Sequence, residues 1–202
     1  MYKVFIENKA IIFEKGPGNI PELLLKYGPS LKKSMFNDFS KALSKIDGPL
    51  IVYSKKPKET LLRLFDQFLY LEAAGGIVQS EEKPLHYLFI KRWDKWDLPK
   101  GKLEKEEHPE IGAKREIHEE CNVQKLRKVA VLPATYHAYF MYDKHVLKKT
   151  HWFLFEGSSN QQLIPQESED ISAVKWFSKD ELSEVTANTY ASLIDLIHLV
   201  CN

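Results

Sequence analysis

Three glutamates within five residues place the strongest constraint on how this chain folds. Glu116, Glu119 and Glu120 stand at positions i, i+3 and i+4, so on a helix their carboxylates point to one side. Like charges at this spacing repel each other and weaken a helix. A chain keeps such a cluster more readily where a cation neutralises it, and magnesium, which prefers oxygen ligands, is the natural candidate. The cluster therefore predicts a helix that carries a divalent-cation site.

The residues around the cluster predict where this helix begins and ends. Pro109 suits a first helical turn, where its missing N–H costs nothing, so we expect a helix from about Pro109 to Cys121. Ala113, Ile117 and Cys121 repeat every four residues and predict its buried stripe. Asn122 is expected to end the helix in the left-handed conformation, which asparagine adopts better than other residues with a side chain.

The segment from residue 101 to residue 123 resembles the signature of the Nudix hydrolases, G-x5-E-x7-R-E-U-x-E-E-x-G-U, in which U is aliphatic. The matching positions are Gly101, Glu107, Arg115, Glu116, Ile117, Glu119, Glu120 and Val123. One position departs from the pattern, because Asn122 stands where the family has its second glycine. A solvated acidic helix face would explain the glutamates alone. It would not explain Gly101 and Glu107 ahead of the helix, or Arg115 beside the cluster.

The resemblance implies a reaction and a metal. Family members hydrolyse a phosphoanhydride in a nucleoside diphosphate linked to another group, and water attacks phosphorus. Glu116, Glu119 and Glu120 would bind Mg²⁺ or Mn²⁺ to neutralise the substrate and polarise its phosphoryl group. Glu116 would in addition orient or deprotonate the water. The carbonyl of Gly101 is a further metal ligand in some members, which requires close approach of the backbone.

The resemblance leaves two roles open. Glu107 either ligates metal or pairs with Arg115, and Arg115 takes the family's role of a structural ion pair that holds the glutamates. The expected catalytic set is Glu107, Arg115, Glu116, Glu119 and Glu120. Because some members use a carboxylate from a later loop as the general base, the alternatives to a glutamate of the helix are Glu167, Glu169 and Asp170.

The run Trp96-Asp-Leu-Pro-Lys-Gly-Lys102 resembles diadenosine-polyphosphate hydrolases and some MutT-like enzymes, whereas members that act on ADP-ribose more often show Pro-Ala-Gly. Lys100 and Lys102 are expected to hold phosphates as point charges. Trp96, or alternatively Trp93, would stack on a base, although a tryptophan near a strand end more often belongs to the core. The favoured substrates are therefore diadenosine polyphosphates or nucleoside triphosphates.

Two other interpretations stay open. The first is a Nudix enzyme acting on ADP-ribose, nucleotide sugars, diphosphoinositol phosphates or a single oxidised nucleotide. The second is a catalytically inactive sensor of a nucleotide ligand, but such proteins usually carry an eroded signature or an added helix-turn-helix. An RNA 5′ end as substrate lacks the basic, aromatic-interleaved stripe that would favour it.

Composition narrows the class of protein. A net charge of +1 over 202 residues creates no field that would draw nucleic acid or a membrane, so the expected partner is a small phosphoanhydride. Cys121 and Cys201 form neither a disulfide framework nor a zinc pattern and are expected to be buried. The opening residues lack a signal-peptide design, and no apolar run reaches membrane-spanning length. We expect a cytoplasmic enzyme.

The hydrophobic pattern predicts an α/β protein in two parts. Residues 1–70 are expected to form a small α+β unit that serves packing or homodimerisation rather than substrate recognition. Its expected elements are strands at 2–6, 10–13 and 50–53 and helices at 31–45 and 58–69. Residues 71–202 are expected to form a Nudix domain, an α/β/α sandwich around a mixed sheet. Its expected further elements are strands at 73–78, 86–91, 127–135, 136–142, 150–156 and 171–177, a capping box at 178–181 and a helix at 190–200.

Overall fold

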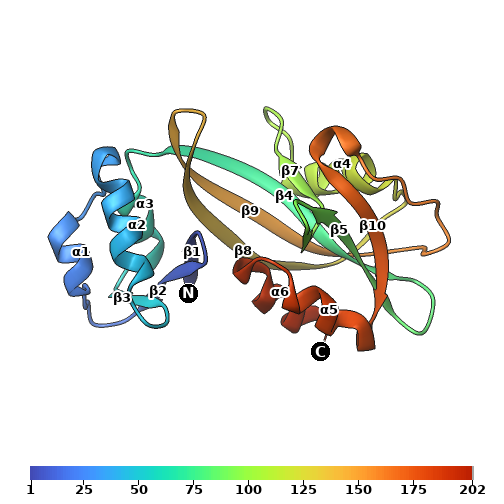
Figure 1. Cartoon of the computed structure of the whole chain (residues 1–202), viewed down its shortest axis with the longest axis horizontal. Helices are drawn as coiled ribbons and strands as arrows, with labels where there is room; N and C mark the ends of the chain where they lie inside the picture. Colours follow the sequence, from blue (N-terminus) through green and yellow to red (C-terminus); the bar gives the residue numbers. More distant parts are fainter. Residues whose placement is uncertain (202) are drawn as a thin grey trace. The chain divides into compact units, whose positions relative to one another are not determined.

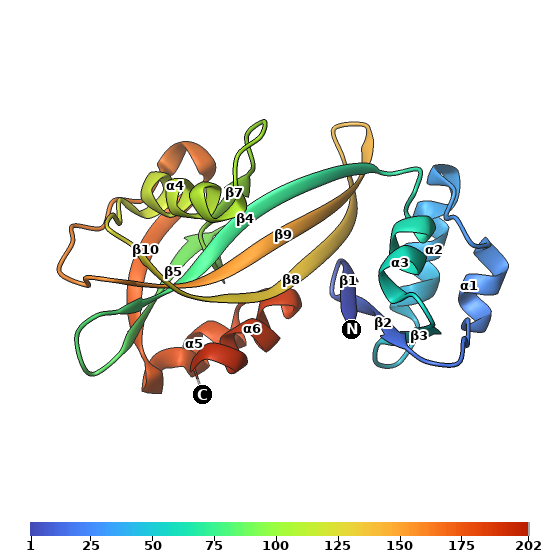
Figure 2. The same ribbon diagram turned by 180° about the vertical axis from the view of Figure 1, so that it is seen from behind.

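The computed structural model describes residues 1–201, which form two compact units (Figure 1, and Figure 2 from behind). Unit 1 consists of Met1–Leu71 and Thr135–Lys149. Unit 2 consists of Glu72–Ala134 and residues 150–201. The segment 135–149 therefore belongs with the N-terminal residues. The predicted division into functional domains at residues 70 and 71 stays a prediction.

Unit 2 is built on a sheet whose hydrogen-bonded order is β10-β5-β4-β9-β8. Two short strands, β6 and β7, add to it by pairing with β5 and β4. The strands are β4 (Leu69–Ser80), β5 (His86–Arg92), β6 (Lys95–Asp97), β7 (Lys100–Lys102), β8 (Arg127–Met141), β9 (Lys144–Gly157) and β10 (Ile171–Ser178). The first residues of β4, the last part of β8 and the first part of β9 extend into unit 1. The two short strands carry the residues just before the acidic helix, so the sheet fixes the approach to the candidate site.

Helices cover both faces of this sheet. Successive side chains of β5 point to opposite faces of the sheet and contact different helices. Leu88 and Ile90 pack with α4 (Pro109–Cys121), while Tyr87 and Phe89 pack with the C-terminal helices. Those helices are α5 (Leu182–Ala187) and α6 (Ala191–Cys201). The predicted α/β/α sandwich is confirmed.

Several predicted elements of unit 2 are confirmed with small shifts. Helix α4 begins at Pro109 and ends at Cys121, as expected. The capping box of Ser178 and Glu181 is present, but it opens a 3₁₀ turn, η3 (Lys179–Glu181), ahead of α5. Both cysteines are free and buried.

The prediction of two strands at 127–135 and 136–142 is wrong, because one strand, β8, spans Arg127–Met141. Pro133 lies inside this strand. Proline is tolerated where a strand has a neighbour on one side only, and the pairing of β8 with β1 begins beyond this residue, at Tyr136.

Unit 1 contains the predicted N-terminal hairpin, β1 (Tyr2–Ile6) and β2 (Lys9–Lys15), and β3 (Leu50–Ser54) runs parallel to β2. The other elements of its N-terminal part are α1 (Glu22–Tyr27), η1 (Lys33–Met35), α2 (Phe36–Ser44) and α3 (Pro57–Leu64). The sequence prediction missed α1, which buries only Leu24 and Tyr27. It also extended α3 too far, because Phe65 and Phe68 pack edge to face in the turn that follows.

Among residues 1–201 no helix has the length and apolar character needed to cross a membrane.

Candidate active site

Helix α4 presents the three glutamates to different surroundings. Glu116 and Glu120 are buried, whereas the side chain of Glu119 is 43% exposed. Beyond the helix, Asn122 adopts the expected left-handed conformation, with φ of 59°, and its side-chain amide donates to the carbonyl of Gln162 at 2.8 Å. The side chain that replaces the family's glycine thus ties the end of the helix to the following loop.

Arg115 connects four groups of the site. Its Nε and Nη2 donate to the two carboxylate oxygens of Glu107, each at 2.9 Å. Its Nη1 donates to Glu116 at 2.7 Å and to Glu119 at 2.9 Å, and Nη2 also reaches the carbonyl of Lys102 at 3.1 Å. The hydrogen bonds from Arg115 hold the pKa of the Glu107 carboxyl below its usual range. Of the two alternatives for Glu107, the geometry favours the pair with Arg115.

Gly101 lies directly against Glu116. A β-carbon built on this glycine would stand 2.0 Å from the Cδ and Oε2 atoms of Glu116, so a residue with a side chain does not fit without displacing the carboxylate. Burial raises the pKa of the Glu116 carboxyl, against the lowering effect of Arg115. The backbone of β7 and this carboxylate therefore approach as closely as a shared metal site at Gly101 would need.

Glu120 is the most deeply buried of the three acids, with no exposed surface. The backbone N–H of Lys100 donates to its Oε2 at 2.8 Å, but its buried Oε1 has no hydrogen-bond partner in the described residues. Burial raises the pKa of this carboxyl to about 8. A buried carboxylate oxygen without a partner is costly, and a cation at Oε1 would remove that cost.

The side chain of Lys100 pairs with Asp97, an acid that was not among the predicted site residues. Its Nζ donates to Oδ2 of Asp97 at 2.6 Å, and the two side chains are 17% and 5% exposed. Burial alone would lower the pKa of Lys100, but the charges of Asp97 and Glu120 raise it overall. The sequence shows only that an aspartate stands three residues before the lysine, and nothing in it indicates that Asp97 is buried.

The remaining predicted substrate-binding residues differ in exposure. Lys102 is exposed, whereas Trp96 is buried and packs edge to face on Phe177 at 4.7 Å between ring centroids. Trp93 is 60% exposed, and the guanidinium of Arg92 lies 4.6 Å from the centroid of its ring. Trp93 is therefore the more accessible of the two candidate stacking rings.

The acidic loop before β10 also reaches the site. Its turn η2 (Glu167–Glu169) places Glu169 where its charge raises the pKa of the Glu116 carboxyl, and Glu169 lies 3.6 Å from Nη1 of Arg92. Asp170 accepts a hydrogen bond from Nε1 of Trp93 at 3.2 Å. Of the three loop carboxylates considered as a base, Glu169 therefore has a charge that acts on the Glu116 carboxyl.

The donor set fits a hard divalent cation. Within residues 1–201 no group of three or more His, Cys, Asp or Glu side chains is arranged to hold a metal ion, and Arg115 binds both Glu116 and Glu119. Magnesium does not require a cage, because it keeps several waters and takes few protein carboxylates. The unpaired Oε1 of Glu120 and the approach of Gly101 to Glu116 supply oxygen ligands of the type it prefers.

Comparison with known proteins identifies the domain. The model of the NUDIX domain matches residues 69–197. A MutT-like protein of Streptomyces ambofaciens is 29% identical over 144 residues, which are 70% of this chain and 83% of that protein. An RNA pyrophosphohydrolase of Zymomonas mobilis subsp. mobilis is 29% identical over 103 residues, which are 45% of this chain and 66% of that protein. Among solved structures, a C. elegans Ap4A hydrolase binary complex matches with a TM-score of 0.49 and 20% identity, over 63% of this chain and 93% of that chain.

Proposed function

Because this chain belongs to the Nudix family, we propose that it hydrolyses a phosphoanhydride bond in a nucleoside polyphosphate with the help of Mg²⁺ or Mn²⁺. The observation that carries the proposal is the buried Oε1 of Glu120, which has no hydrogen-bond partner among the described residues. It lies on a helix that also presents Glu116 and Glu119. A neutral hydrogen-bonding ligand would not explain three acids on one helix face. A polyphosphate with its bound cations would.

In the proposed mechanism, Glu116, Glu119, Glu120 and the carbonyl of Gly101 would hold the metal. When bound, the metal neutralises the substrate charge and polarises the phosphoryl group under attack. Water forms the new O–P bond, the bridging P–O bond breaks, and the leaving phosphate carries away the electron pair. The proton of the water passes to a carboxylate. We propose Glu116 or Glu169 as that base, because the charge of Glu169 acts on the Glu116 carboxyl.

Arg115 and Glu107 act as positioning residues in this proposal. The guanidinium binds Glu107 through two parallel hydrogen bonds and uses its remaining donors on Glu116, Glu119 and the β7 backbone. A planar fork of donors suits this arrangement, and a lysine could not reproduce it. The pair therefore fixes the glutamates without itself touching the phosphates.

For the substrate, diadenosine polyphosphates and nucleoside triphosphates remain favoured. The name of the C. elegans structure mentions Ap4A, but the support we use is local. Lys102 is exposed beside the acids and is free to meet phosphate, whereas Lys100 is held by Asp97. We propose Trp93 in place of Trp96 as the ring that stacks on a base, because Trp93 is 60% exposed whereas Trp96 is buried.

The proposed activity is tested by a substrate panel. The purified chain with Mg²⁺ or Mn²⁺ is assayed on diadenosine polyphosphates, nucleoside triphosphates, ADP-ribose, nucleotide sugars, diphosphoinositol phosphates and a 5′-triphosphorylated RNA. Turnover of one class that stops with EDTA and returns with metal supports the proposal and names the substrate. Tight binding of one ligand without turnover of any would support the sensor interpretation instead.

Unit 1 is proposed to mediate a homodimer. Its exposed apolar side chains include Leu25, Phe140, Met141 and Tyr142, and burying them against a second copy would be favourable. Light scattering on the full chain tests the idea. A mass that stays that of a single chain at high concentration would refute it.

A further inference from the structure

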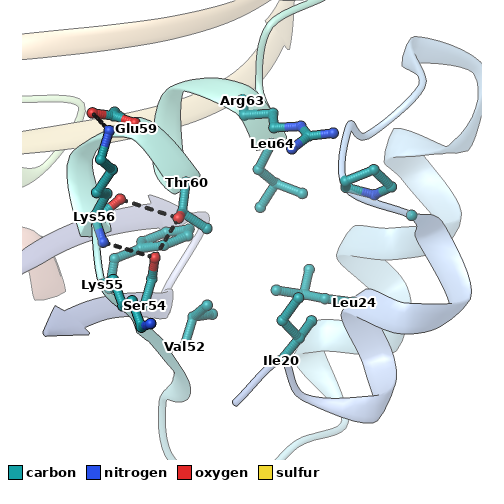
Figure 3. A pocket seen from close by; sticks show the side chains of 13 residues that line it. Ile20, Leu24, Val52, Ser54, Lys55, Lys56, Glu59, Thr60, Arg63 and Leu64 are labelled. Atoms are coloured by element: carbon teal, nitrogen blue, oxygen red, sulfur yellow. Dashed lines mark hydrogen bonds and ion pairs between the residues drawn. The ribbon is translucent and has the colours of Figure 1, made fainter. Parts of the chain in front are cut away.

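Unit 1 has an open cavity of about 340 Å³ that none of the proposed chemistry uses. Its floor is apolar and consists of side chains that are almost completely buried, among them Phe13, Leu24, Val52 and Leu64. Figure 3 shows Leu24 of α1 and Leu64 of α3 pointing toward one another into the hollow. The volume lies at the lower end of the roughly 300–1,000 Å³ typical of small-molecule sites, so a compact ligand would fill it.

One side of the cavity is polar and satisfied within the protein. The hydroxyls of Ser54 and Thr60 lie 2.7 Å apart, and the Ser54 hydroxyl also accepts from the backbone N–H of Lys56 at 3.1 Å. These bonds join the end of β3 to the first turns of α3, as the dashed lines in Figure 3 show. The wall is therefore preformed. Since the Thr60 hydroxyl donates to the carbonyl of Lys56 at 3.1 Å, both hydroxyl donors are used and each oxygen can only accept one further hydrogen bond.

The rim of the cavity carries an excess of positive charge. Lys56 forms an ion pair with Glu59 at 2.9 Å, and Glu59 is the single acidic residue in the lining. Within residues 1–201, Arg63 and Lys55 have neither an ion pair nor a side-chain hydrogen bond, and both line the same opening. An apolar floor with unpaired cations at its mouth matches a ligand that is apolar at one end and anionic at the other.

We propose that this cavity binds a small amphipathic oxyanion, with its apolar body between Leu24 and Leu64 and its anionic group at Arg63. The guanidinium suits a carboxylate or a phosphate, because both accept its two parallel donors. A bare divalent cation does not fit, since the lining offers a single carboxylate that is already paired. All lining residues belong to unit 1, so the site is separate from the acidic site on α4.

In the test, the protein chain, with its methyl groups isotopically labelled for NMR, is titrated with decanoate, decyl phosphate and the neutral analogue decanol. Decanoate, decyl phosphate or both should shift the methyl signals of Leu24, Val52 and Leu64. Decanol should bind about tenfold more weakly, because it lacks one charge-assisted hydrogen bond. Which of the two anions binds more tightly identifies the anionic group.

Two variants localise the binding. Arg63→Gln should weaken anion binding by about tenfold, and Ile20→Trp, a change at a half-exposed position of the mouth, should block all three ligands. The matched control is Lys58→Gln, which removes an exposed cation of the same helix outside the lining. Methyl shifts elsewhere in the chain, equal binding by Arg63→Gln, or no binding of either anion would overturn the proposal. None of these results depends on hydrolysis.

Discussion

Glu116 packs its carboxylate against the α-carbon of Gly101, so closely that a β-carbon there would stand 2.0 Å from Oε2. The contact joins strand β7 to helix α4, and Arg115 strengthens it by donating both to Glu116 and to the carbonyl of Lys102. The glycine is thus required by the space that the carboxylate occupies. Its backbone has no positive φ that would call for glycine.

The first prediction concerns that contact. Gly101→Ala should lower kcat by about 10²-fold, because a displacement of about 1 Å at a reacting centre has an effect of this size. The thermal unfolding midpoint should change little, since the displaced carboxylate can move toward solvent. Glu104→Ala, an exposed change in the following loop, is the control and should leave kcat unchanged. Wild-type kcat in Gly101→Ala would show that the approach of Gly101 to Glu116 has no part in the reaction.

The second prediction concerns the buried pair of Asp97 and Lys100. Asp97→Asn and Lys100→Met should each reduce the free energy of unfolding by about 3 kcal/mol, because each leaves a buried charge without its partner. The double variant should lose clearly less than the sum, as measured by urea denaturation. Lys56→Met, from an exposed ion pair, should change stability by less than about 1 kcal/mol.

The same variants separate two roles for Lys100. If its ammonium served the substrate phosphates, Lys100→Met would raise KM and leave the free energy of unfolding unchanged. The structure favours an unchanged KM and a reduced free energy of unfolding, because Nζ of Lys100 is hydrogen-bonded to Asp97. The contact with Glu120 comes from the backbone N–H of Lys100, which the substitution keeps.

The third prediction is a pH dependence. Burial raises the pKa of Glu120 from 4.5 to about 8, so between these values the folded protein binds more protons than the unfolded chain. Stability without metal should therefore fall as pH rises through this window, by at most about 5 kcal/mol at about 1.4 kcal/mol per pKa unit. Denaturation at a series of pH values measures it.

Glu120→Gln should remove most of this slope, because the amide cannot ionise, whereas the exposed Glu104→Gln should keep it. Added Mn²⁺ should stabilise the wild-type protein more at high pH, where the carboxylate is available as a ligand. A stability that rises from about pH 5 to about pH 8 in the absence of metal would have the wrong sign for a buried acid.

The fourth prediction distinguishes the two tryptophans. Trp93→Ala should raise KM for the nucleotide substrate about tenfold, consistent with the loss of one stacked base, and should leave stability nearly unchanged. Trp96→Ala should cost about 3–5 kcal/mol of unfolding free energy, because the ring is packed in the core against Phe177. The reverse pattern in KM and stability would return the stacking role to Trp96.

Much of the site was predictable because it depends on local spacing. The bounds of α4, the left-handed Asn122 and the clustering of acids on one face follow from helical periodicity and end signals within a single segment. The bidentate contact of Arg115 with Glu107 was among the alternatives, but the choice needed the path of the loop that precedes the helix.

What the sequence did not reveal depends on contacts between distant segments. Trp93 and Trp96 are indistinguishable by composition, and only the pairing of β6 with β5 decides which one is buried. The partner of Lys100 was equally hidden, because Asp97 reads as a loop residue until its burial is known. In unit 1, helix α1 is too short for its hydrophobic periodicity to be recognised. The cavity beside it is lined by residues that are distant in the sequence, so it could not be predicted either.

The central claim is that the acids of α4 hold a divalent metal that hydrolysis requires, and Mn²⁺ binding measured by EPR beside turnover tests it most directly. Wild-type protein should bind Mn²⁺ and hydrolyse its substrate. Glu119→Gln and Glu120→Gln should lose turnover by at least about 10²-fold and bind Mn²⁺ more weakly, while remaining folded. Wild-type turnover in both variants, or turnover by the wild-type protein that persists in excess chelator, would contradict the account.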